Sequence, residues 1–124
     1  MNDIYKEQIL DHYKNPRNFG ELNNPDVSSS DNLVSCGDQL SFFVKLNTDK
    51  TIITEVKFNG DGCAISMASA SLLTEYILDK NISDLKKLNR DGILNMLGIS
   101  LSPTRLKCAL LPLEVLHKAL NRLT

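Results

Sequence analysis

Two segments with alternating apolar residues, 40–46 and 52–58, constrain the fold of this chain most strongly. Such alternation is typical of strands with one buried face, and the apolar positions are Leu40, Phe42, Val44, Leu46, Ile52, Val56 and Phe58. The polar run 47–50 between the segments predicts a turn, so we expect an antiparallel hairpin. A sheet with one apolar face needs a covering layer, which the rest of the chain must supply.

Three segments with apolar residues at helical spacing predict the helices that cover the sheet. Apolar residues recur at helical spacing over 5–13, a segment that Asp3 can cap and that Pro16 ends, over Ile65 to about Asp79, and over 110–123. Residues 15–35 are rich in turn formers, so we expect an irregular segment with one edge strand near Val27 or Leu33. This order of elements predicts an α+β fold.

The remaining helix boundaries rest on capping residues and on one proline. Ser83 and Asp91 predict the N-caps of two short helices, the second of which ends at Gly98. Pro112 is compatible with the last helix only if that helix begins just after Cys108, which places the proline in its first turn.

Size and charge limit the classes of function. A chain of 124 residues, 42% of them hydrophobic, is long enough for one core, so we expect a single domain over residues 1–124. The formal net charge of −1 predicts no general attraction to nucleic acid or to an anionic membrane. The sequence shows neither a long apolar run nor a secretion signal, and we therefore expect a cytoplasmic protein.

The three cysteines are the candidate chemical groups. Their odd number and wide spacing argue against a secreted disulfide framework, and a reducing compartment would keep them available for metal or sulfur chemistry. Cys36 precedes Gly37, Cys63 follows a glycine turn, and Cys108 follows Lys107. We expect all three at the ends of helices or strands, where helix N-termini and the cation of Lys107 favour thiolate over thiol.

Asp38 adds an oxygen to this set. If the stretch is extended, Cys36 and Asp38 point the same way, because side chains alternate along a strand. Three thiolates and a carboxylate suit tetrahedral zinc, and thiolate-rich sites also suit iron–sulfur clusters. The chain has no Cys-x-x-Cys pair, and a lone cysteine is often a small buried hydrophobe, so that alternative stays open for each cysteine. A hard carboxylate among soft sulfurs is easily displaced, which predicts a site that exchanges its metal or cluster.

Five ordered blocks resemble the iron–sulfur cluster assembly scaffold family, which comprises IscU, SufU and the N-terminal domain of NifU. The resemblance spans nearly the whole chain, and the blocks are Tyr5–Asn18, Cys36–Asp38, Gly60–Ser66, Ser69–Ser71 and Arg105–Ala109. It implies a small three-stranded antiparallel sheet packed by about four to five helices. It also implies that Cys36, Asp38, Cys63 and Cys108 are the metal and cluster ligands.

The function that the resemblance implies has two forms. A scaffold accepts persulfide sulfur from a cysteine desulfurase and holds a transient two-iron two-sulfur cluster for acceptor apo-proteins or downstream assembly factors. A SufU-type protein instead binds zinc and acts as a sulfurtransferase. A cysteine must leave its metal before its thiolate can attack a persulfide. Cys108 and Cys36 are therefore the candidate sulfur acceptors, since Cys63, expected at a helix start, should be less mobile. The resemblance predicts a monomer or a weak homo-oligomer.

The segment before the third cysteine departs from both forms. IscU-type members carry a histidine where this chain has Lys107, and a lysine there resembles SufU. SufU proteins usually have an extra segment between the second and third cysteines, which this chain lacks. The branch therefore stays open, and a structural zinc-binding interaction module remains an alternative from another class. His12 and His117 lie within helical patterns, and we assign them ordinary surface or partly packed roles.

Overall fold

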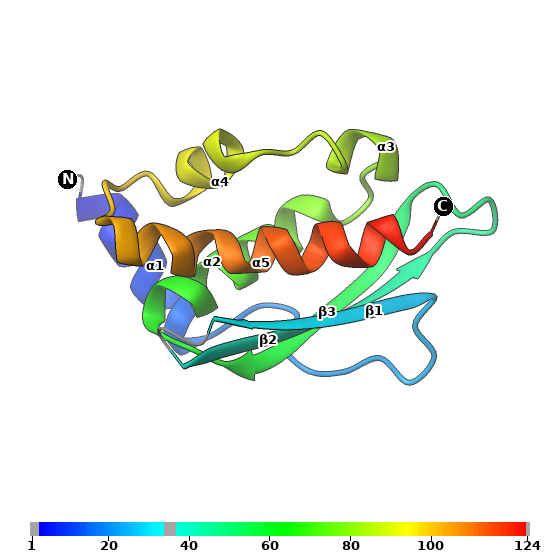
Figure 1. The fold of residues 1–124 in the computed structure, drawn as a ribbon, viewed down its shortest axis with the longest axis horizontal. Coiled ribbons are helices and arrows are strands. Elements are labelled where there is room, and N and C mark those ends of the chain that lie inside the picture. Colours follow the sequence, from blue (N-terminus) through cyan, green and yellow to red (C-terminus); the bar gives the residue numbers. More distant parts are fainter. Residues whose placement is uncertain (1–2, 34–36, 124) are drawn as a thin grey trace.

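The computed structural model describes residues 3–33 and 37–123, with side chains from Lys6 onward. This part of the chain contains one antiparallel sheet and five helices (Figure 1), which confirms the predicted α+β class. The elements in chain order are α1 (Asp3–Lys14), β1 (Val27–Leu33), β2 (Asp38–Leu46), β3 (Ile53–Asp61), α2 (Ala64–Ile77), α3 (Ile82–Leu85), α4 (Arg90–Leu97) and α5 (Pro103–Asn121).

The predicted hairpin forms two of the three strands of the sheet, β2 and β3. The strand order is β1-β2-β3, with β2 antiparallel to both neighbours. Leu40 lies opposite Gly60, and Phe42 lies opposite Phe58. Both strands of the hairpin extend beyond the predicted limits, because β2 already begins at Asp38 and β3 continues to Asp61. The edge strand predicted near Val27 or Leu33 is confirmed as β1.

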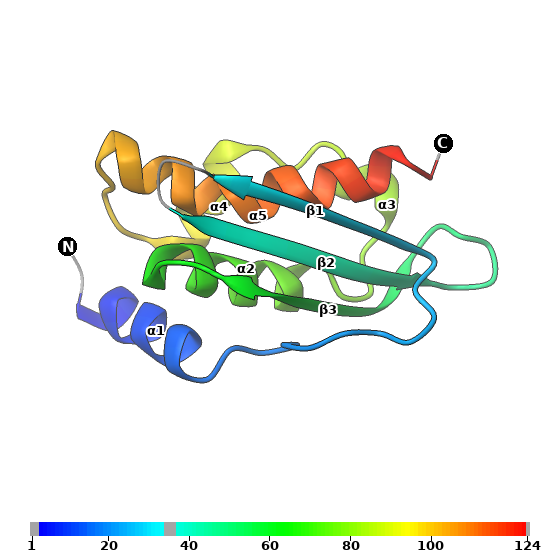
Figure 2. The same cartoon turned by 60° about the horizontal axis from the view of Figure 1, so that its bottom comes forward.

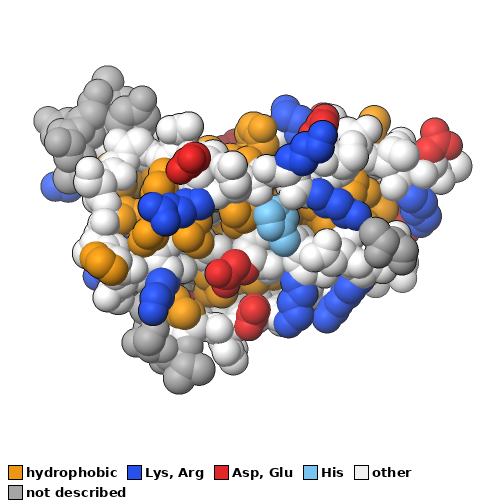
Figure 3. Space-filling model, turned by 45° about the horizontal axis from the view of Figure 1, so that its top comes forward, with side chains coloured by type: hydrophobic (Ala, Val, Ile, Leu, Met, Phe, Trp, Pro, Cys, Tyr) orange, Lys and Arg blue, Asp and Glu red, His pale blue; other side chains and the backbone are white. Residues whose placement is uncertain are grey.

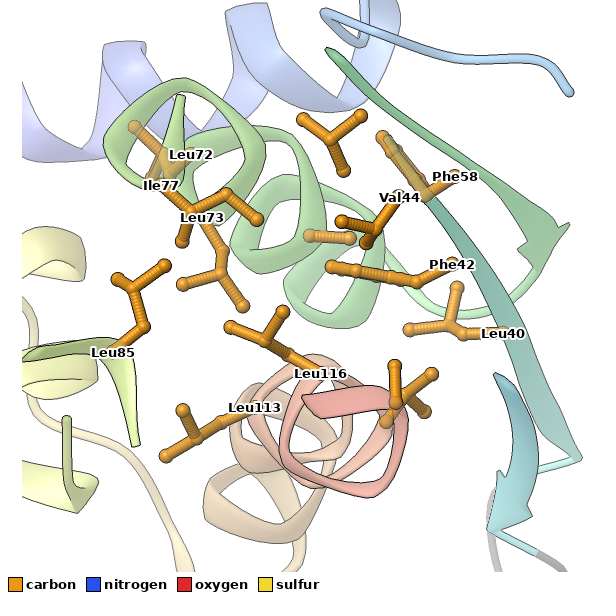
Figure 4. Close-up of a cluster of buried hydrophobic side chains, with 14 of the residues drawn as sticks. Leu40, Phe42, Val44, Phe58, Leu72, Leu73, Ile77, Leu85, Leu113 and Leu116 are labelled. Carbon is orange, nitrogen blue, oxygen red and sulfur yellow. The ribbon is translucent and has the colours of Figure 1, made fainter. Parts of the chain in front are cut away.

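Helices α2 and α5 cover the inner face of the sheet (Figure 2). Apolar side chains of β2, β3, α2 and α5 point toward one another in the core (Figure 4), and Phe42, Phe58, Leu73 and Leu116 are fully buried. Helix α1 packs on α2, while α4 packs on both α2 and α5. Helix α2 is therefore surrounded, and it is rich in alanine and serine, whose small side chains allow close packing on several sides.

The N-caps of the two short helices lie two residues before the predicted ones. Asn81 and Asn89 are the N-caps of α3 and α4, in place of Ser83 and Asp91. The side-chain oxygen of Asn81 accepts the Ser83 N–H at 2.9 Å, as an N-cap oxygen does for the second or third residue of a helix. Gly98 ends α4 in the left-handed conformation, as predicted.

The predicted start of the last helix is wrong. Helix α5 begins at Pro103, after the N-cap Ser102, whose Oγ accepts the Arg105 N–H at 3.3 Å. Cys108 thus lies in the second turn of the helix rather than before it, and Pro112 lies inside the helix. The prediction assigned a single signal, Pro112, to the helix start and overlooked Ser102-Pro103, which is the stronger one.

One face of the molecule carries mixed charge. On the face in Figure 3, lysine and arginine side chains are interspersed with acidic and hydrophobic ones. Over the residues that the structure describes, no helix has the length and apolar character needed to cross a membrane.

Candidate metal centre

Three side chains that can bind a metal meet at one end of the sheet. Asp38 opens β2, Cys63 is the N-cap of α2, and Cys108 lies in α5. Their ligand atoms, one carboxylate oxygen and two sulfurs, all lie within 4.8 Å of one another. Asp38 and Cys108 are buried, whereas Cys63 is partly exposed, so solvent reaches the cluster on the side of Cys63.

The alternation of β2 directs Asp38 into the protein. Asp38 occupies the first position of the inward-facing stripe that continues through Leu40 and Phe42, and it is only 2% exposed. Two donors hold its carboxylate. The backbone N–H of Cys63 donates to Oδ1 at 3.0 Å, and the hydroxyl of Ser66 donates to Oδ2 at 2.5 Å. A buried carboxylate needs such donors, because burial without them would strongly disfavour its charge.

Two glycines, Gly60 and Gly62, lie where the chain passes from β3 into α2, close to β2 and to Asp38. Gly60 has a φ of +143°, and a Cβ there would lie 2.1 Å from the carbonyl oxygen of Gln39. A Cβ at Gly62 would lie 3.2 Å from both Cγ of Asp38 and Cβ of Ser66. The backbone conformation at position 60 and its close approach to Gln39 therefore require glycine. The lack of a side chain at Gly62 leaves room for the Asp38 carboxylate.

The Cys63 thiol is poised toward the thiolate. Burial raises its pKa, and the nearby Asp38 carboxylate raises it further. The backbone amide and hydroxyl of Ser66 and the thiol of Cys108 act in the opposite direction and prevail, so the pKa lies below its usual value. The predicted effect of a helix start on a cysteine is thus consistent with the environment of Cys63.

The setting of Cys108 differs from the predicted one. Its side chain is 1% exposed, whereas the adjacent Lys107 is exposed, because successive helical residues point in different directions. Pro112 has no N–H to donate to the Cys108 carbonyl, which lies four residues earlier in α5. The Ser66 hydroxyl lies 3.1 Å from that carbonyl oxygen. A proline is therefore tolerated inside this helix.

Cys36, the fourth predicted ligand, lies outside the residues that the structure describes. The other three predicted ligands lie together. Sequence reasoning missed Ser66, whose oxygen lies 3.6 Å from the sulfur of Cys63. The available signal was spacing, since residues three apart share one face of a helix.

The histidines lie outside this cluster, as expected, but His12 is more buried than predicted. It is 5% exposed, and its Nδ1 lies 2.7 Å from Oγ of Ser71. The same Ser71 oxygen accepts the Arg17 N–H at 2.8 Å, so it links α2 to both His12 and Arg17. Burial, more than the nearby Arg17, lowers the pKa of His12. His117 is partly buried, with Nε2 3.2 Å from the carbonyl of Leu85.

The donor set fits a thiophilic metal. In a tetrahedral zinc site with Zn–S bonds of about 2.3 Å, neighbouring sulfurs are about 3.8 Å apart. The separations within the cluster, all below 4.8 Å, require only small adjustments to reach such a geometry. Two sulfurs and one oxygen leave one ligand position to be supplied.

Comparisons with known proteins agree with this site and fold. The model of the NifU-like N terminal domain matches residues 4–124. The zinc-dependent sulfurtransferase SufU of Bacillus subtilis is 37% identical, and the match covers 98% of this chain and 92% of that protein. The iron-sulfur cluster assembly scaffold protein IscU of Rickettsia prowazekii is 36% identical, with 94% and 88% covered.

A solved structure shares the architecture. The crystal structure from Fervidobacterium islandicum, described as an iron-sulfur cluster assembly scaffold protein for the SUF system, superposes with a TM-score of 0.81. It is 30% identical, and the match covers 95% of this chain and 97% of that one. The chain belongs to the NifU-like N-terminal domain family, whose relatives here include both IscU and SufU proteins.

Proposed function

We propose that this protein is an iron–sulfur cluster assembly scaffold that accepts persulfide sulfur from a cysteine desulfurase and holds a transient two-iron two-sulfur cluster. The observation that carries the proposal is the convergence of Asp38, Cys63 and Cys108, with ligand atoms within 4.8 Å. Cys36, two residues before Asp38, is the fourth ligand in this proposal. The cluster is cargo, and its recipients are acceptor apo-proteins or downstream assembly factors.

Sulfur enters by thiol exchange in this proposal. A thiolate of this chain attacks the terminal sulfur of the desulfurase persulfide, a new S–S bond forms, and the desulfurase leaves as a thiolate. No external oxidant is required. Cys36 and Cys108 remain the proposed acceptors, but Cys108 is 1% exposed and lies within α5, so its attack requires local opening of the helix. Burial therefore counts against Cys108 as the first acceptor.

An apolar hollow beside the site supports a docking position for the desulfurase. It has a volume of about 250 Å³ and begins one residue after Cys63. Leu10, in its wall, is 43% exposed. The hollow is lined by Lys6, Ile9, Leu10, Ala64, Ile65 and Ile99. A partner bound there would approach the exposed side of the metal centre.

A zinc-dependent sulfurtransferase of SufU type is the second candidate, and Lys107 before Cys108 favours it. Bound zinc would hold the cysteines as thiolates until the desulfurase docks. The length of the chain favours the scaffold instead. The alignment with the Bacillus protein has 139 positions, more than the 124 residues of this chain, whereas that with the Rickettsia scaffold has 119. The Bacillus protein therefore carries sequence that this chain lacks.

One experiment separates these functions: metal analysis and visible absorption after anaerobic incubation with iron, cysteine and a desulfurase. The proposed function predicts sulfur-to-iron charge-transfer bands on this protein, which move to the acceptor when acceptor apo-protein is added and the two proteins are then separated. Stoichiometric zinc, no colour and strong stimulation of desulfurase turnover would establish the sulfurtransferase. Zinc without any effect on turnover would leave a structural zinc module. We expect the protein to act in the cytoplasm.

A further inference from the structure

Ser66 connects the three elements that carry the metal centre. It is the third residue of α2, one turn after Cys63, and it is fully buried. Its Oγ lies 2.5 Å from Oδ2 of Asp38, 3.6 Å from the sulfur of Cys63 and 3.1 Å from the carbonyl oxygen of Cys108. One hydroxyl thus reaches β2, the start of α2, and α5.

The contact with Asp38 fixes the plane of the carboxylate. Oδ1 accepts the Cys63 N–H at 3.0 Å, while Oδ2 accepts the Ser66 hydroxyl. Both donors belong to the start of α2, so rotation about the Cβ–Cγ bond breaks both hydrogen bonds together. A carboxylate oxygen has two acceptor positions, which leaves each oxygen able to bind a metal as well.

The contact with Cys108 depends on Pro112. Because proline has no N–H, the carbonyl of Cys108 lacks its usual partner in α5, and the Ser66 hydroxyl faces it. The hydroxyl has a single proton for two acceptors. If Asp38 moves, the hydroxyl retains the Cys108 carbonyl as an acceptor, so Ser66 itself is not left unsatisfied.

We propose that Ser66 is a positioning residue that aims the Asp38 carboxylate at the sulfurs of Cys63 and Cys108 before metal binds. This inference rests on the metal centre of the proposed function. Residues that hydrogen-bond metal ligands orient them, and loss of such a residue typically lowers metal affinity by about 10- to 100-fold. Ser66 fulfils this role without contributing a ligand of its own.

The test compares Ser66→Ala with Ser69→Ala. Ser69 is a matched control, because it is buried in the same helix and also donates to a carbonyl of α5, that of Ala109, at 2.7 Å. Cobalt(II) titration reports both affinity and coordination through its visible absorption. We expect Ser66→Ala to bind cobalt at least about tenfold more weakly and with shifted bands. Ser69→Ala should retain the affinity and spectrum of the unaltered protein.

Amide hydrogen exchange of Cys63 in the metal-free protein provides an independent readout. If Ser66 holds Asp38 in place, Ser66→Ala loosens the acceptor of the Cys63 N–H, and this amide exchanges severalfold faster, whereas Ser69→Ala leaves it unchanged. Urea unfolding establishes that each variant is folded. Ser66→Thr, which keeps a hydroxyl, replaces Ser66→Ala in the comparison if the alanine variant is unfolded, and should then retain the original spectrum.

The outcomes are distinguishable from failure of the proposed function. Failure of the unaltered protein to bind cobalt would reject the metal centre, and the exchange measurement would still decide whether Ser66 holds Asp38. Cobalt binding by the unaltered protein, with equal affinities and equal exchange in the two alanine variants, would overturn the positioning role. Equal weakening in both variants would also overturn it, because the effect would then be general packing of α2 against α5.

Discussion

Replacing Gly62 with alanine should damage the metal centre while sparing the fold. The new Cβ would lie 3.2 Å from Cγ of Asp38 and from Cβ of Ser66, where ordinary contacts begin at 3.4 Å. The carboxylate must therefore move by a few tenths of an ångström in a site whose donors hold it closely. We expect zinc affinity to fall by about tenfold, which corresponds to ~1.4 kcal/mol.

The same change should have little effect on stability. The backbone of Gly62 does not have a positive φ, so an alanine can adopt its conformation. Alanine reduces the conformational freedom of the unfolded chain, which stabilises the folded protein by about 0.4–1 kcal/mol. This gain offsets the destabilisation from the tight contacts of the new Cβ. The assays are thermal unfolding of the metal-free protein by circular dichroism and zinc competition with a chromophoric chelator.

Gly60→Ala is the control with the opposite result. Its Cβ would lie 2.1 Å from the Gln39 carbonyl oxygen, at a φ of +143° that a residue with a side chain rarely adopts. Relief requires separation of β2 from β3, so we expect a loss of about 4 kcal/mol or more and a fall in Tm on the order of 15 °C. Unchanged zinc affinity in Gly62→Ala, or a stability loss as large as that of Gly60→Ala, would refute the reasoning.

Three further changes test other parts of the site and fold. Asp38→Ala should slow release of metal or cluster severalfold, because the carboxylate is the most easily displaced ligand; stopped-flow transfer to an acceptor measures this, and unchanged or faster release would contradict it. Iodoacetamide should modify Cys63 before Cys108 in the metal-free protein, since Cys108 is 1% exposed and the pKa of Cys63 is lowered; peptide mass spectrometry would show equal rates if burial were irrelevant. Burial lowers the pKa of His12, so the unfolded state takes up the proton first as pH falls below about 6.5, and metal-free stability declines over that range. His12→Gln should reduce the difference between urea midpoints at about pH 7.5 and 5.5, and an undiminished difference would exclude His12 as its source.

The arrangement of strands was predictable because the apolar period is local. Alternation over 40–46 and 52–58 defined the hairpin and most of its buried face. The exception is Ile52, in place of which Ile53 is buried, because the pairing shifts register between Lys45 and Leu46. Extending that hairpin by its own register brings Asp38 next to the glycine turn before Cys63, since Gln39 pairs with Asp61. The proximity of Asp38 and Cys63 was therefore present in the sequence, although the spacing of the cysteines alone did not reveal it.

The position of Cys108 was not predictable by the same means. It depends on how α5 packs across the sheet, which is a long-range property of the core. The start of α5 was misjudged because a proline inside a helix normally costs a hydrogen bond, and the compensating donor, Ser66, lies 42 residues away from Cys108 in the chain. Ser66 itself was hidden because its role follows from contacts with both Asp38 and α5. The caps at Asn81 and Asn89 were missed because Ser83 and Asp91 are also good capping residues.

Zinc K-edge X-ray absorption of the metal-loaded protein tests the central claim most directly. A site built from Cys36, Asp38, Cys63 and Cys108 predicts three sulfurs at about 2.3 Å and one oxygen at about 2.0 Å. Asp38→Ala should remove or replace the protein oxygen while the sulfurs remain. Zinc surrounded only by oxygen and nitrogen, or a spectrum that Cys63→Ser and Cys108→Ser leave unchanged, would contradict the account.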